Sequence, residues 1–121
     1  MLEEVGAQRP DSVLEDLVRQ RLLNDGFRPQ PDPQACAVEI RGGRVLHVDV
    51  PFAAYRVGLE CDGYGSQRER SSLDIDALRH NDLADVGWRL LRVTWTIYTR
   101  RWDGLLGQLA RLIAASDGAT A

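Results

Sequence analysis

The sequence predicts an α/β domain in which one central mixed sheet is flanked by helices. Residues 45–63 alternate apolar and polar side chains and are rich in valine, as is typical of two strands joined by a turn. Apolar residues recur at helical spacing in residues 12–26 and again in 100–115. A compact apolar segment at 88–94 follows a third helical segment, and a strand after a helix indicates a crossover connection. The expected order is helix, three strands, helix, strand and helix.

Length and composition limit the classes of protein to which the chain can belong. Its 121 residues suit one domain with a single core, and the formal net charge of −3 gives no overall attraction to nucleic acid. No apolar run could span a bilayer and no signal pattern begins the chain, which indicates a cytoplasmic protein without a membrane partner. The sequence contains no P-loop, no GxGxxG fingerprint and no lysine.

The first helix is expected to begin at about Ser12, after a flexible lead-in over residues 1–11. Ser12 and Glu15 have the Ser-x-x-Glu spacing of a capping box, which explains Glu15 without any catalytic role. Gly26 suits the end of this helix, and Phe27 supplies a hydrophobic contact after it. The apolar stripe of the helix consists of Leu14, Leu17, Val18 and Leu22.

The other elements follow with glycines at their ends. They are a strand over 36–41, the hairpin over 45–63, a helix over about 72–86, a strand over 88–94 and a helix over about 100–115. Gly42-Gly43 turns the first strand into the hairpin, and Gly87 ends the middle helix. The domain is expected to cover 12–115, with a frayed tail over 116–121. The predicted core consists of Leu17, Leu46, Val48, Val50, Leu59, Leu91, Val93, Leu105 and Leu109.

Acidic residues gather on one face of the hairpin. If the turn centres on residues 54–55, Asp49 lies opposite Glu60 and His47 lies opposite Asp62. Like charges directly opposed are destabilising, and a bound cation would turn this repulsion into attraction. Carboxylate oxygens suit Mg²⁺ or Mn²⁺, and an imidazole nearby suits a general acid or base. A solvated polar face without metal explains the same pattern equally well.

Basic residues are expected near the same end of the hairpin. Arg68 and Arg70 lie in the loop after it, where they could meet phosphates. Arg92 shares a strand face with Thr94 and either contacts phosphate or merely finishes the sheet edge. Gly58 removes a side chain from the acidic face, which often marks the close approach of a ligand or of backbone.

Several polar residues have purely structural explanations. Asp76 and Arg79 are spaced to face each other on the middle helix, where a surface ion pair is the plain interpretation. His80, on the same polar face, is expected to be a surface residue. Cys36 and Cys61 have no metal-ligand spacing, and Cys61 falls on an apolar strand face, as suits a reduced core thiol.

Four segments in order carry a resemblance to a known family. The segments are Asp49, then Glu60-Cys61-Asp62-Gly63, then Asp76-x-x-Arg79-x-x-x-Leu83, then GWRLLRVTW over 87–95. Together they resemble the very-short-patch-repair (Vsr) endonuclease-like branch of the PD-(D/E)XK nuclease superfamily, a domain also found at the C-terminus of abortive-infection antitoxin-like proteins. The resemblance covers residues 12–113.

The resemblance implies an αβββαβ core and Mg²⁺- or Mn²⁺-dependent cleavage of DNA phosphodiester bonds. Asp49 and Glu60 match the family's acidic ligands, and Glu15 matches an acidic position on the first helix. Asp62 stands where the superfamily motif has lysine. The relatives also carry a histidine where Ser66-Gln67 stands here, and His47 is the candidate to fill part of that role.

The candidate site therefore combines a central group of carboxylates with arginines around it. The alternatives are an inactive nuclease-fold module that binds nucleic acid or a protein partner, in a defence or toxin–antitoxin context, and a small structural domain. The candidate catalytic residues are Asp49, Glu60, Asp62, Glu15 and His47. The candidate metal ligands are Asp49, Glu60 and Asp62, and the candidate DNA contacts are Arg68, Arg70, Arg79 and Arg92.

Overall fold

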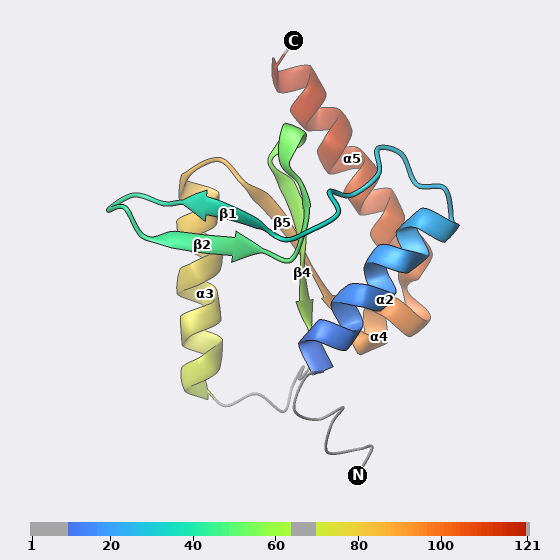
Figure 1. The fold of residues 1–121 in the computed structure, drawn as a ribbon, viewed down its shortest axis with the longest axis horizontal. Helices are drawn as coiled ribbons and strands as arrows, with labels where there is room; N and C mark the ends of the chain where they lie inside the picture. Colours follow the sequence, from blue (N-terminus) through green and yellow to red (C-terminus); the bar gives the residue numbers. More distant parts are fainter. Residues whose placement is uncertain (1–9, 64–69, 121) are drawn as a thin grey trace.

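A computed structural model describes residues 10–63 and 70–120 of the chain, with the side chains of 12–63 and 74–116. It is an α/β structure, and the expected order of elements is confirmed, except that the first hairpin strand is divided in two and a short additional helix precedes the last one (Figure 1). The elements are α2 (Pro10–Asn24), β1 (Cys36–Glu39), β2 (Val45–Val48), β3 (Val50–Phe52), the 3₁₀ turn η1 (Ala53–Tyr55), β4 (Val57–Asp62), α3 (Arg70–Asp85), β5 (Arg89–Thr94), α4 (Trp95–Arg100) and α5 (Trp102–Thr120).

Strand β4 is the centre of a three-stranded mixed sheet. It pairs antiparallel with β3 and parallel with β5, and α3 makes the crossover between the two parallel strands. The predicted hairpin register is confirmed where the strands pair, since Val50 lies opposite Leu59 and Phe52 opposite Val57. The turn between them is the short 3₁₀ helix η1.

The expected single sheet is wrong, because the chain leaves the β4 ladder at Asp49. Strand β2 instead pairs with β1 in a separate two-stranded sheet, where His47 lies opposite Ala37. At the break, the backbone carbonyl of Asp49 accepts a hydrogen bond from Arg19 at 2.8 Å, and its carboxylate accepts one from the Cys61 N–H at 3.0 Å. Side-chain bonds thus replace the ladder here, and His47 does not reach its predicted place opposite β4.

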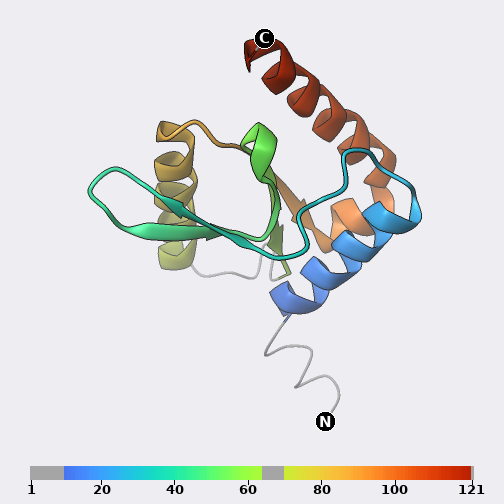
Figure 2. The same ribbon diagram turned by 45° about the horizontal axis from the view of Figure 1, so that its top comes forward.

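Helices cover both faces of the sheet. Figures 1 and 2 show α3 on one side of β4 and β5, and α2, α4 and α5 on the other. The larger core joins α2 and α5 to the sheet, and the smaller one lies under α3. The larger core consists of Leu14, Val18, Leu22, Val50, Phe52, Val57, Leu59, Cys61, Val93, Trp102, Leu105, Leu109 and Ile113, and the smaller of Val38, Ile40, Val48, Leu83 and Trp88.

Most residues of the predicted core are buried, but the prediction is wrong for Leu17, which is exposed. The residues that are buried as predicted are Val48, Val50, Leu59, Val93, Leu105 and Leu109. Leu46 and Leu91 are half-buried, and Leu17 is 38% exposed. Leu14, Val18 and Leu22, four residues apart, already form the stripe of α2 that faces the sheet, so Leu17 lies beside that stripe.

The glycine ends of α2 and α3 are as predicted. Gly26 has a φ of 73°, and the N–H of Phe27 donates to the carbonyl of Leu22 at 3.0 Å. Gly87 has a φ of 96° and ends α3 in the same way. These bonds form the Schellman pattern, which only a left-handed residue permits, and they satisfy carbonyls that the helix leaves without partners.

The outer ends of the first and last helices differ from the prediction. Helix α2 begins at Pro10, so Ser12 lies inside its first turn and does not form the expected capping box. Proline suits the start of a helix because its missing N–H would have no partner there. Helix α5 continues to Thr120, although a frayed tail was expected from residue 116.

We expect Gly58→Ala to lower the free energy of unfolding by about 1–3 kcal/mol, because it overfills a packed site. A Cβ at Gly58 would lie 2.4 Å from Cγ1 of Val48, so the close approach is made by a core side chain and not by the ligand or backbone that the sequence suggested. Urea denaturation measures the effect. Gly104→Ala is the control, since its Cβ meets nothing within 4 Å and should be neutral or slightly stabilising. Equal curves for the two variants would contradict this packing.

Candidate functional site

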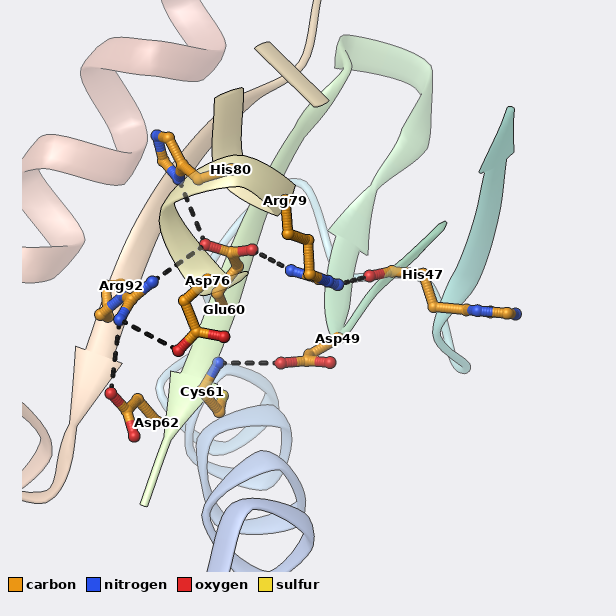
Figure 3. A network of polar contacts seen from close by, with 9 residues as sticks. All are labelled: His47, Asp49, Glu60, Cys61, Asp62, Asp76, Arg79, His80 and Arg92. Atoms are coloured by element: carbon orange, nitrogen blue, oxygen red, sulfur yellow. Dashed lines mark hydrogen bonds and ion pairs between the residues drawn. The ribbon is translucent and has the colours of Figure 1, made fainter. Parts of the chain in front are cut away.

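A hollow of about 210 Å³ opens where the C-terminal half of β4 faces α3 and β5. Alternate residues of a strand face opposite sides, so Glu60 and Asp62 point toward α3 while the Cys61 side chain joins the larger core. Figure 3 shows the carboxylates and guanidinium groups turned toward one another. The residues that line the hollow are Asp49, Glu60, Cys61, Asp62, Asp76, Arg79 and Arg92.

Glu60 is the most enclosed carboxylate of the hollow, with only 6% of the residue exposed. Its Oε2 accepts a hydrogen bond from Arg79 of α3. Its Oε1 lies 3.3 Å from Nδ1 of His80 and 3.9 Å from Nη2 of Arg92. A buried carboxylate is tolerated only when it is paired and hydrogen-bonded, and here two guanidinium groups compensate its charge.

Arg92 joins two further carboxylates at the other end of the hollow. The parallel register places it beside Glu60 on the neighbouring strand. Its Nη1 lies 3.4 Å from Oδ2 of Asp62, which is 7% exposed, and 3.8 Å from Oδ2 of Asp76. Acidic and basic groups thus alternate across the hollow, and the network ties β4, β5 and α3 together.

Asp49 and Glu60 line the same hollow, although the ladder does not extend to them and they do not pair across it. Asp49 lies at the break between β2 and β3, where the bond from the Cys61 N–H holds its carboxylate against the edge of β4. That the two carboxylates share a cation stays a prediction.

Other candidate residues lie elsewhere. His47 is exposed and its ring points away from the hollow in Figure 3; only its backbone carbonyl takes part, as an acceptor for Arg79. Glu15 is half-buried on α2 and is not among the lining residues. Arg68 lies outside the described residues, and so does the side chain of Arg70.

Sequence reasoning missed two members of this network, Asp76 and His80. The sequence pattern places both on a solvated helix face and pairs Asp76 with Arg79 there. In the structure Arg79 binds Glu60, and Asp76 lies near Arg92, so this face of α3 turns toward the sheet. The signal was the spacing of these residues to Leu83, which is fully buried, because residues three, four and seven apart share one helix face.

The donor chemistry of the hollow fits a hard divalent cation. Within residues 10–63 and 70–120, no three carboxylate, imidazole or thiol groups are grouped closely enough to hold a metal ion as they stand. Mg²⁺, however, commonly uses one or two carboxylates and fills its shell with water and substrate phosphate. Asp49 and Glu60 are the residues that could hold such an ion, and a cation on Glu60 would have to replace one of its basic partners.

The cysteines are structural. Both are free, and Cys61 is buried in the larger core, as the strand pattern predicted. Burial raises the pKa of the Cys36 thiol, and the negative charge of Asp32 raises it further. Cys36 therefore stays protonated at neutral pH and is a poor metal ligand.

A model of the restriction-endonuclease-like family REase_MTES_1575 matches residues 14–113, which include every residue that lines the hollow. Searches among curated proteins and among solved structures found no match to the chain. No helix in the described part of the chain combines the length and the apolar character needed to cross a bilayer.

Proposed function

The chain belongs to this restriction-endonuclease-like family, and we propose that it is a metal-dependent endonuclease that hydrolyses DNA phosphodiester bonds. The observation that carries the proposal is the meeting of Asp49, Glu60 and Asp62 with Arg79 and Arg92 around one hollow. Carboxylates suit a hard cation, and guanidinium groups suit phosphate. The sequence resemblance to the Vsr-like branch adds DNA as the proposed substrate.

Each side chain of the hollow has a role in this proposal. A bound Mg²⁺ or Mn²⁺ would polarise the phosphodiester and activate a water molecule. Asp49 and Glu60 would hold the cation, and Asp62 would orient the attacking water, since a carboxylate only accepts hydrogen bonds. Arg79 and Arg92 would hold the phosphate, which fixes the position of the strand without reading its sequence.

The experiment that tests the function is cleavage of plasmid DNA by the purified chain. Nicked and linear products are expected with Mg²⁺ or Mn²⁺, and a chelator should abolish them, because the carboxylates alone provide no Lewis acid. Cleavage that persists at full rate in chelator would contradict a metal-dependent mechanism.

We expect Asp49→Asn to lose most of the rise in melting temperature that Mn²⁺ gives the wild type. A ligand that binds only the folded state stabilises it, and Asn removes the charge that attracts the cation. The Asn side-chain oxygen can still accept the hydrogen bond from the Cys61 N–H, so the fold at the break should persist. Thermal melts across a Mn²⁺ titration measure the effect, and equal shifts for both proteins would place the cation elsewhere.

One observation favours a second function, a nuclease-fold module that binds nucleic acid without cleaving it. Both carboxylate oxygens of Glu60 already have basic partners, so the network is compensated without any metal. For such a module, DNA binding would be equally strong in chelator and in Mg²⁺, and no product would appear with either metal.

A further inference from the structure

The two oxygens of Glu60 differ from those of an ordinary exposed ligand, because basic groups already face both. Arg79 donates to Oε2, while His80 and Arg92 lie 3.3 and 3.9 Å from Oε1. Of these groups, only Arg79 contacts Oε2, whereas His80 and Arg92 share Oε1. A cation that binds Glu60 through Oε2 must therefore displace the guanidinium of Arg79.

The guanidinium of Arg79 is partly exposed to solvent, so it can move away from Glu60 without crossing the protein core. Its two terminal nitrogens divide between Glu60 and the backbone carbonyl of His47, so one planar group bridges β4 and β2. The side chain of Arg79 is 27% exposed, whereas that of Glu60 is 8% exposed. The carboxylate is thus fixed on the central strand, and the guanidinium lies at the rim of the hollow, in contact with solvent.

We infer that Arg79 occupies the metal position on Glu60 until a DNA phosphate takes up its guanidinium, so that DNA and metal bind cooperatively; this rests on the proposed function. A phosphodiester offers two oxygens to the same planar donors that now serve Glu60 and His47. A guanidinium that leaves without a replacement would leave a buried carboxylate poorly compensated, which is strongly unfavourable. The divalent cation supplies that replacement.

Each ligand therefore prepares the site for the other. The phosphate frees Glu60 for the metal, and the metal releases Arg79 for the phosphate. Such a coupling is reciprocal, so DNA must tighten metal binding by the factor by which metal tightens DNA binding. Couplings between sites in proteins are typically about 5–150-fold.

The test is the dissociation constant of Mn²⁺, measured by calorimetry with and without a saturating short DNA duplex whose backbone resists hydrolysis. For the wild type, DNA should tighten Mn²⁺ binding about tenfold, within the usual range of coupling. For Arg79→Gln, Mn²⁺ should bind more tightly than to the wild type in the absence of DNA, and the ratio with and without DNA should fall severalfold. A simple loss of positive charge would tighten binding in both conditions and leave that ratio unchanged.

Arg44→Gln is the matched control. Like Arg79, Arg44 donates to a carboxylate: its partner is Asp82 of α3, at 3.0 Å. Arg44 is not among the residues that line the hollow, so the Mn²⁺ dissociation constants of this variant should equal those of the wild type. If Arg79→Gln does not fold, Arg79→Lys replaces it. One nitrogen cannot span the two acceptors as the guanidinium does, and Mn²⁺ alone should again bind more tightly than to the wild type.

The outcomes separate this inference from the function on which it rests. A DNA-dependent ratio in Arg79→Gln equal to that of the wild type would overturn the exchange and leave a metal-dependent nuclease in place. An unchanged Mn²⁺ dissociation constant in Arg79→Lys would overturn it as well. A wild type that binds no Mn²⁺, with or without DNA, would overturn the proposed function and the inference together.

Discussion

Glu60→Gln should slow metal-dependent DNA cleavage by about 10²-fold or more. Loss of a group that only supports a metal ligand already reduces metal affinity or activity by about 10–100-fold, and Glu60 is proposed as a direct ligand. Glutamine keeps the shape of the side chain but removes its charge, and with it the attraction for a cation. The rate of nicking of supercoiled plasmid, in Mg²⁺ and in Mn²⁺, measures the effect.

The control for this variant is Glu39→Gln, the same change at an exposed glutamate of β1. It should cleave like the wild type when it is purified identically. Equal rates for Glu60→Gln and the wild type would mean that the activity belongs to a contaminant. Absence of cleavage by all three proteins would favour the binding module. Because Arg79 and Arg92 lose a counter-charge in Glu60→Gln, its melting temperature must be measured alongside, at the assay conditions.

Leu59→Ala should lower the free energy of unfolding by about 2–5 kcal/mol, the usual range for a leucine removed from a packed core. Leu59 is fully buried at the centre of β4, in the core that joins the sheet to α2 and α5. Its truncation leaves a cavity between the sheet and the helices α2 and α5. Urea denaturation monitored by circular dichroism gives the difference in unfolding free energy.

The same substitution at Leu78 is the control, because this residue is 63% exposed on α3. Its change in unfolding free energy should stay within about 0.5 kcal/mol. If the two variants unfold at the same urea concentration, the larger core does not lie where the structure places it.

The local parts of this fold could be predicted because neighbouring residues determine them. The spacing about residues 54–55 predicts the register that pairs Val50 with Leu59, and Asp49 and Glu60, the neighbours of these two residues in the chain, line one hollow. Gly26 and Gly87 predict the ends of their helices because the left-handed conformation there excludes most other residues. Alternation along a strand likewise predicts that Cys61 and Glu60 face opposite sides.

The composition of the site depends on contacts between distant segments. At the break of the sheet, Arg19, thirty residues earlier, donates to the carbonyl of Asp49, and His47 pairs with β1 and not with β4. Asp76 and His80 join the site because α3 packs that face onto β4 and β5. Strand alternation and turn spacing are short-range properties that a sequence displays directly. Which charged groups meet in a hollow is decided only when helix and sheet are packed. A buried carboxylate is stable only beside a basic side chain, and the packing determines which basic side chain lies near it.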